Sequence, residues 1–99
     1  MAKKKMVEVL FVPVSGDVVS REIADDDLKT MQAMVGGYIE PVRLNRESTL
    51  FVNEEGLLMG LKLNPRLSLL ADRPLVGNGF IEKPTPEILE AFKGYSVAL

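Results

Sequence analysis

The sequence predicts a single α+β domain with an antiparallel or mixed sheet of about five strands. One main helix over residues 25–35 is expected on one face, with a short helix at residues 65–71 and a C-terminal helix at residues 86–93. Two observations predict this class: short apolar segments alternate with turn residues, and three polar or proline-containing helix starts lie between them. The 99 residues suffice for one core, and neither a repeat nor a linker divides residues 1–99.

The first two strands are expected to form a hairpin. Residues 6–14 are apolar on both faces of a strand, which is typical of a central strand, and Pro13 marks its end. Ser15-Gly16-Asp17 is a turn sequence, and residues 18–23 alternate again between apolar and polar positions. The two strands therefore pair across three turn residues.

The main helix is predicted from an acidic start and an apolar stripe. Asp25-Asp26-Asp27 supplies an N-cap and an acidic first turn, and Gly36-Gly37 ends the helix with a left-handed C-cap. A calcium loop would need further carboxylates and a glycine at defined positions, which are absent, so no metal site is predicted. The stripe expected to face the core is Leu28, Met31, Met34 and Val35.

A second hairpin is expected after the helix. Residues 38–44 form a third strand in which Pro41 removes an amide donor, so this strand lies at an edge or carries a bulge. Residues 49–52 pair back on it as a fourth strand. Residues 57–63 are apolar except at Gly60 and Lys62 and are interpreted as a short fifth strand.

The C-terminal part begins at a clear helix start. Asn64 is an N-cap followed by proline at the first helical position, and Thr85-Pro86 repeats this pattern. Residues 75–81 resemble a strand broken at Gly77-Asn78-Gly79, and residues 95–99 form a tail that adds a strand, packs or frays. With one sheet face under the main helix, the other face is either solvated or closed by a second subunit, so we expect a homo-oligomer.

The composition excludes several function classes. The chain has no Cys and no His, so it lacks a thiol nucleophile, a disulfide framework and the side chain best suited to proton transfer near neutral pH. A net charge of −2 gives no general attraction to nucleic acid or a lipid surface, and no run approaches a membrane span. Residues 1–5 are expected to be a basic, flexible N-terminus without a signal peptide, and the location to be cytoplasmic.

No cofactor is predicted either. Gly77-Asn78-Gly79 contains Gly-x-Gly, but Glu82 stands where the dinucleotide fingerprint needs a third glycine, so a glycine corner is the preferred interpretation. Exposed amides around Gly77 and Gly79 would still allow a ligand to approach closely.

Polar residues at the ends of the predicted elements are the candidate ligand contacts. Arg66 is the most informative, because a cation in the first turn of a helix opposes the helix dipole unless an anion sits there. A surface salt bridge to Asp72 or Glu55 is the competing and preferred explanation. The full set of candidate ligand-binding residues is Tyr38, Arg43, Asn64, Arg66, Gly77, Asn78 and Gly79.

Three segments, in this order and spacing, carry a family resemblance. They are Gly36-Gly37-Tyr38-Ile39-Glu40, Val52-Asn53-Glu54-Glu55-Gly56, and Gly60-Leu61-x-Leu63-Asn64-Pro65-Arg66 followed by Leu75-Val76-Gly77. Over roughly residues 7–81 the chain resembles the domain of unknown function 3846 family of small bacterial, phage and mobile-element proteins. The resemblance implies a cytoplasmic, mobile-element setting and supplies no catalytic residues.

The leading hypothesis is a non-enzymatic binding protein of phage type. One version sequesters an anionic, nucleotide-type signal of host defence, held by Arg66, Arg43, the Gly77–Gly79 amides and a stacking Tyr38. The first alternative is a module that docks on a host or phage protein through the strand containing Pro41 or an uncovered sheet face. A small enzyme is disfavoured for want of His and Cys, and a DNA-binding protein for want of positive charge.

Overall fold

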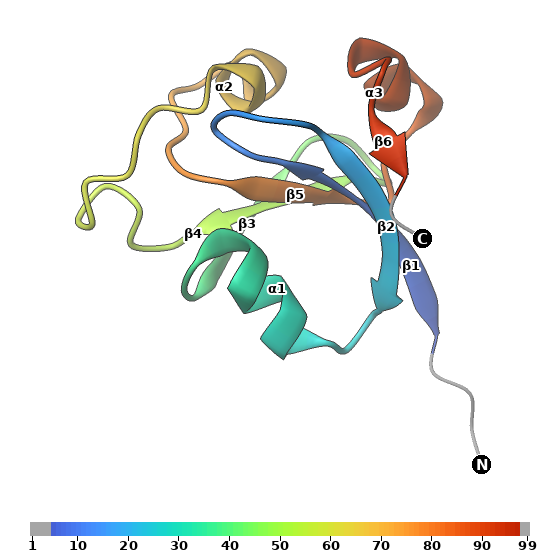
Figure 1. Cartoon of the computed structure of the whole chain (residues 1–99), viewed down its shortest axis with the longest axis horizontal. Coiled ribbons are helices and arrows are strands. Elements are labelled where there is room, and N and C mark those ends of the chain that lie inside the picture. The colour runs from blue at the N-terminus through green and yellow to red at the C-terminus, as the bar shows by residue number, and fades with distance from the viewer. Residues whose placement is uncertain (1–4, 98–99) are drawn as a thin grey trace.

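A computed structural model describes residues 5–97 as one six-stranded sheet with helices on both faces (Figure 1). Helix α1 lies on one face, and α2 and α3 lie on the other. Residues 1–4 of the predicted basic N-terminus and the last two residues of the predicted tail lie outside the described part. The elements are β1 (Met6–Val12), β2 (Val19–Ala24), α1 (Leu28–Val35), β3 (Ile39–Arg43), β4 (Thr49–Asn53), α2 (Pro65–Ala71), β5 (Gly79–Glu82), α3 (Pro86–Ala91) and β6 (Ser96–Val97).

The sheet is mixed, with strand order β3-β4-β5-β1-β2-β6. Neighbours pair antiparallel except β6, which runs parallel to β2 and adds a sixth strand from the tail. The predicted α+β class is therefore confirmed, and so are the central position of β1 and the edge position of β3. The register places Pro41 opposite Phe51 in that edge strand, where a missing amide donor is tolerated.

The predicted fifth strand at residues 57–63 is wrong. These residues form successive turns, and only Leu63 makes an isolated bridge, to Val76. Gly60 has a φ of +68°, a left-handed conformation outside the extended region of a regular strand. The strand expected at residues 75–81 instead starts at Gly79, after the glycine corner, and is the segment that joins β4 to β1.

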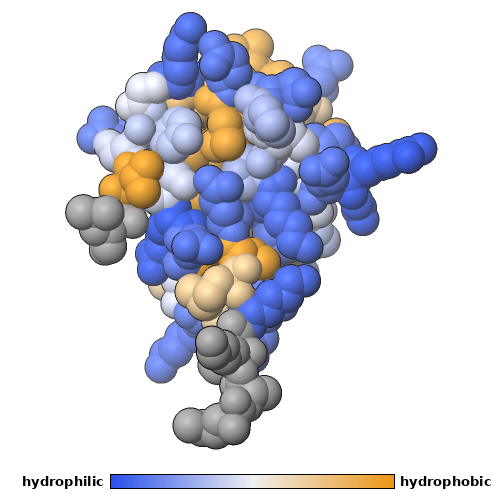
Figure 2. Space-filling view, turned by 90° about the vertical axis from the view of Figure 1, so that its right-hand side faces the viewer, coloured by the Kyte–Doolittle hydropathy of each residue, from blue (hydrophilic) through white to orange (hydrophobic). Residues whose placement is uncertain are grey.

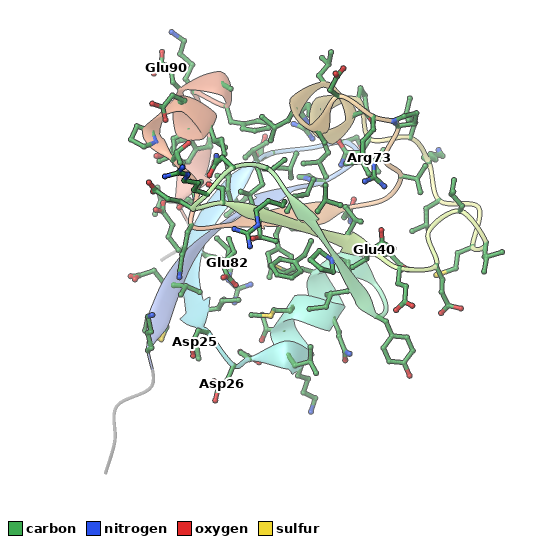
Figure 3. All side chains as sticks on the ribbon, turned by 180° about the vertical axis from the view of Figure 1, so that it is seen from behind. Asp25, Asp26, Glu40, Arg73, Glu82 and Glu90 are labelled. Atoms are coloured by element: carbon green, nitrogen blue, oxygen red, sulfur yellow. The ribbon has the colours of Figure 1, made fainter. Side chains whose placement is uncertain are left out.

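Helix α1 starts later than the acidic triplet predicts. Only Asp27 is the N-cap: its carboxylate accepts from the Thr30 amide at 3.1 Å and the Thr30 hydroxyl at 2.7 Å. Asp25 and Asp26 form the preceding turn at the end of β2, so the helix lacks an acidic first turn (Figure 3). The stripe is also shorter than expected, because Leu28 is 51% exposed. The C-cap prediction is confirmed at Gly36, whose φ is +78°.

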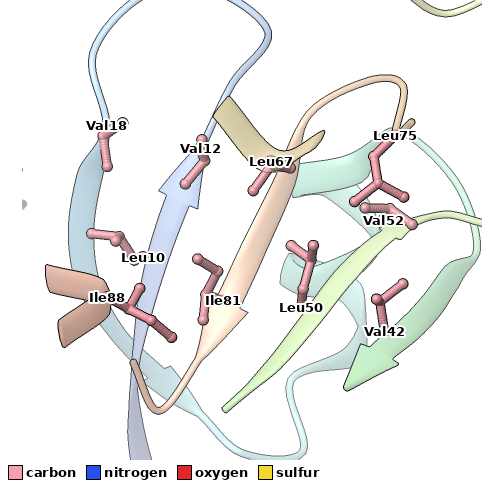
Figure 4. Packing of buried hydrophobic residues seen from close by; sticks show 10 residues of the cluster. All are labelled: Leu10, Val12, Val18, Val42, Leu50, Val52, Leu67, Leu75, Ile81 and Ile88. Atoms are coloured by element: carbon pink, nitrogen blue, oxygen red, sulfur yellow. The ribbon is translucent and has the colours of Figure 1, made fainter. Parts of the chain in front are cut away.

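The second face of the sheet is closed by the chain itself, which corrects the expectation of a solvated or partner-covered face. Leu67 of α2 and Ile88 of α3 pack on the apolar residues of β1, β4 and β5 (Figure 4). Short helices suffice here because proline and a capping side chain start both of them, at Asn64-Pro65 and Thr85-Pro86. Helix α3 ends at Ala91, slightly earlier than the predicted 93. The buried residues of this closed face are Leu10, Val12, Val18, Val42, Leu50, Val52, Leu67, Leu75, Ile81 and Ile88.

The surface differs from side to side. Over β2, β6 and α3 it is mostly hydrophilic, with small separate apolar spots (Figure 2). At the other end of the sheet, residues 54–63 project as a loop that carries exposed leucines (Figure 1). Within residues 5–97, every helix is too short and too polar to cross a membrane.

Candidate functional site

The predicted ligand residue Asn64 is a buried structural link. Its side chain is fully buried, and its Oδ1 accepts from the Leu67 amide at 3.1 Å as the N-cap of α2. Its Nδ2 donates to the carbonyl oxygens of Val12 and Gly77, each at 3.0 Å. One amide group therefore joins α2 to the end of β1 and to the chain before β5, and these bonds account for its burial.

Arg66 braces the β1–β2 turn. Its Nη2 donates to the Pro13 carbonyl at 2.6 Å and its Nη1 to the Gly16 carbonyl at 3.0 Å. Between described residues the structure records no ion pair from Arg66 to Asp72 or Glu55, so the preferred salt-bridge explanation is wrong. The two carbonyl acceptors therefore hold the guanidinium against this turn.

The glycine corner is packed rather than open. Gly77 has a φ of +81°, its amide donates to the Lys62 carbonyl at 2.8 Å, and a Cβ there would lie 2.7 Å from Leu61 Cδ1. A Cβ on Gly79 would lie 2.8 Å from the Phe51 carbonyl oxygen. Both glycines are buried, so the expectation of exposed amides at these two positions is wrong, and close packing explains the glycines.

Tyr38 and Arg43 lie apart from the other predicted residues. Tyr38 precedes the edge strand β3 and is exposed, and Arg43 ends β3 with its Nη1 donating to the Arg46 carbonyl at 3.2 Å. Strands β4 and β5 separate β3 from the β1–β2 turn, where Asn64, Arg66 and the glycine corner gather. The structure thus brings five predicted residues together and leaves two at the sheet edge.

The predicted residue Asn78 lines a cavity and retains an unused side-chain donor. Its Oδ1 accepts from the Val14 amide at 2.9 Å, which fixes the plane of its side-chain amide. The residue is exposed, and residues 5–97 offer its Nδ2 group no acceptor. A fixed amide with a free N–H group is suited to recognising a ligand acceptor.

Asn78 lies at the junction of two cavities that run along the side of α1. The first, of about 540 Å³, lies between α1 and the β1–β2 strands, and the second, of about 330 Å³, lies between α1 and residues 59–62. Ala33, Met34 and Asn78 line both, so we treat them as one feature and call it the α1 groove. The remaining lining residues are Phe11, Val14, Val19, Arg21, Thr30, Val35, Gly36, Met59, Leu61, Lys62 and Gly77.

The α1 groove has apolar walls and a cation in each of its cavities. Arg21 lines the first cavity and Lys62 the second, and both residues are exposed. The register places Arg21 opposite Val9 and Val19 opposite Phe11, so all four side chains share the face that α1 covers in part. Mostly apolar walls with a few polar groups are typical of small-molecule sites, and the two volumes together fall in their usual range.

Sequence reasoning missed Arg21, Phe11 and Lys62 as site residues. The signal for Arg21 was present, because it alternates with Val19 and Ile23 and therefore had to share their otherwise apolar face. No comparable signal marked Lys62, since the segment around it was interpreted as a strand and is a loop.

Comparison with known proteins gives one match. The family model described as Domain of unknown function (DUF3846) matches residues 6–94, which run from the start of β1 past the end of α3 and stop before β6. No curated protein and no solved structure matches the chain.

Proposed function

The chain belongs to the DUF3846 family, a family of domains of unknown function, and we propose that it binds a small anionic ligand in the α1 groove without transforming it. The observation that carries the proposal is the combination of apolar walls with Arg21, Asn78 and Lys62 in one groove. Catalysis is not part of the proposal, because a sequence without His and Cys lacks the usual proton carrier and the strongest nucleophile.

The ligand class follows from the lining of the groove. Phe11 and Met34 offer apolar surface to a flat ring, and the fixed amide of Asn78 offers a donor to an acceptor on the ring edge. Arg21 supplies a guanidinium for a phosphate or carboxylate group, for which arginine has the better geometry, and Lys62 a second positive charge. These features favour a nucleotide-type ligand.

In the cell, the proposed role of this binding is to sequester a nucleotide-type signal. A phage or mobile-element protein that holds a nucleotide-type signal of host defence needs affinity and abundance, and it needs no catalytic group. The phage or mobile-element setting is part of the proposal, and the lining of the α1 groove is what supports ligand binding within it.

The proposal is tested by titrating the purified protein with nucleoside monophosphates, triphosphates and cyclic dinucleotides while following the melting temperature. A ligand present at about 100 times its Kd stabilises the fold by about 2.7 kcal/mol, which for a domain of this size raises Tm by roughly 10 °C or more. No shift with any compound, together with recovery of a stoichiometric protein partner, would favour the docking alternative instead.

A matched pair of arginine variants locates the site. Arg21→Gln should weaken binding about 10-fold to 100-fold, as expected for a lost charged hydrogen bond. Arg43→Gln removes another exposed arginine, at the end of β3 and away from the groove, and should leave the affinity unchanged. The reverse result would place the ligand at the sequence-predicted edge residues and reject the α1 groove.

A further inference from the structure

The loop over residues 54–63 exposes several large apolar side chains to solvent. Leu57 is 83% exposed and Leu58 is 87% exposed, and Met59 and Leu63 are each more than half exposed. The loop is also well tied at its base: Asn53 Nδ2 donates to the Val35 carbonyl at 3.1 Å, and the Leu61 amide donates to the Gly56 carbonyl at 3.0 Å. Its leucines are therefore held outward by a fixed backbone, and such exposed apolar groups commonly mark an interaction site.

A cavity lies directly beside these leucines. It measures about 340 Å³, and Leu57 and Leu58 form part of its wall. Its other apolar lining comes from Val52 of β4 and from the chain between α2 and β5, at Pro74, Leu75 and Val76. A projecting apolar group and an apolar hollow therefore occur side by side on one surface.

The same surface carries charges of both signs. Glu40 of β3, Glu54 and Arg73 all line this cavity. Figure 3 shows Glu40 and Arg73 on the side of the molecule from which the 54–63 loop projects. No ion pair joins Arg73 to either glutamate among the described residues, so its guanidinium is open to a carboxylate from elsewhere.

From these features we propose that this surface is the interface of a two-fold symmetric homodimer. We call it the leucine patch, defined as Leu57, Leu58, Pro74, Glu40, Glu54 and Arg73. A two-fold axis brings the same patch of two chains together, so each contact between two different residues occurs twice. The leucines of one copy then enter the hollow of the other.

The charges of the leucine patch are suited to a second copy of the same chain. Under a two-fold axis Arg73 of each chain faces the acidic residues of the other, so a patch with both signs is complementary to itself. A patch with charges of a single sign would repel a second copy of itself, whereas this patch would not. The inference goes beyond the proposed ligand binding, because the leucine patch and the α1 groove are lined by different residues.

The first test measures the mass of the full chain in solution by sedimentation velocity over a range of micromolar concentrations. The wild-type chain should sediment as a dimer, and Leu57→Ser/Leu58→Ser should sediment as a monomer with an unchanged circular dichroism spectrum. Leu69→Ser is the matched control, because Leu69 is an exposed leucine on α2 outside the patch, and it should remain dimeric. A monomeric wild type, or a dimeric double variant, would overturn the proposal.

The second test exchanges the charges. Arg73→Glu makes every charge of the patch negative, and Glu40→Lys/Glu54→Lys makes every charge positive, so each variant alone should be monomeric. Mixing the two should restore a dimer that contains one chain of each kind, because both two-fold contacts then join opposite charges. Restoration on mixing cannot come from misfolded chains, and failure of the mixture to dimerise would reject the two-fold arrangement.

Discussion

The two faces of the sheet are covered to different degrees. On the closed face, α2 and α3 together with the chain that follows each of them bury apolar residues from four strands and from the β1–β2 turn. On the other face, α1 makes its main contacts with β3, β4 and β5, and a groove remains over β1 and β2. The closed face is therefore sealed by the chain itself, while the partly covered face retains a groove.

The dimensions of the elements explain the difference. Six strands about 4.8 Å apart make a sheet roughly 24 Å wide, whereas one helix with its side chains is about 10 Å across. A single helix of 8 residues cannot cover such a sheet, and α1 sits where the Phe51–Phe80 pair provides its largest apolar support. The face beside α1 stays open as a result.

The largest expected effect compares two phenylalanines that are paired across neighbouring strands. Phe80 of β5 is fully buried and stacks on Phe51 with ring centroids 5.1 Å apart, while Phe11 of β1 opposes Phe80 and lines the groove. Phe80→Ala should destabilise the fold by about 4 kcal/mol, and Phe11→Ala by about 1.5 kcal/mol, because only the first leaves a closed cavity.

Chemical denaturation with urea measures both phenylalanine variants, with the m-value as a check that the unfolding remains two-state. Equal losses for Phe11 and Phe80 would show that the groove is closed in solution.

A smaller loss of stability is expected when either of two asparagines is changed to alanine, one at the start of α2 and one at the α1 groove. Asn64→Ala should cost about 3 kcal/mol, because it removes the N-cap of α2 and leaves the buried carbonyls of Val12 and Gly77 without a donor. Asn78→Ala should cost less than about 1 kcal/mol, because water can replace its exposed bond to the Val14 amide.

Thermal unfolding followed by circular dichroism ranks the two asparagine variants. If Asn78→Ala lowers the melting temperature more than Asn64→Ala does, then Asn78 rather than Asn64 is the asparagine that stabilises the fold, and the proposed roles are incorrect.

The smallest loss of stability is expected when a larger side chain is placed on each face of the sheet. Val12→Leu places an extra carbon in the closed face, where Val12 is fully buried, and should cost about 1–3 kcal/mol. Ala33→Leu adds volume on the exposed side of α1, in the groove, and should change stability by less than about 0.5 kcal/mol. The melting temperatures of the two variants check this, and a large loss for Ala33→Leu would contradict an open groove.

Local sequence signals predicted the element ends well. Gly36 ends α1, and Asn64-Pro65 and Thr85-Pro86 start α2 and α3, because caps act within one helical turn of the chain. The apolar residues on both faces of residues 6–14 likewise predicted that β1 is a central strand. These features depend on neighbours in sequence, which a sequence displays directly.

The site could be predicted only in part. Asn78 was identified from its glycine neighbours, and it lies at the centre of the groove. Arg66 was singled out as unusual and Asn64 was predicted as an N-cap, but Arg66 also bonds Pro13, 53 residues away, and Asn64 also bonds Val12, 52 residues away. Such separations leave no trace in local patterns, so these links to the end of β1 were not visible.

The sequence by itself determined the α+β class, the caps, the central and edge strands and the absence of imidazole and thiol, since each follows from residue type or short-range periodicity. Only the tertiary structure decided that residues 57–63 form a projecting loop, that α2 and α3 close one face, and that α1 leaves a groove beside Arg21. The physical reason is that covering a sheet depends on the relative widths and positions of distant elements, and these are fixed by packing between segments far apart in the chain.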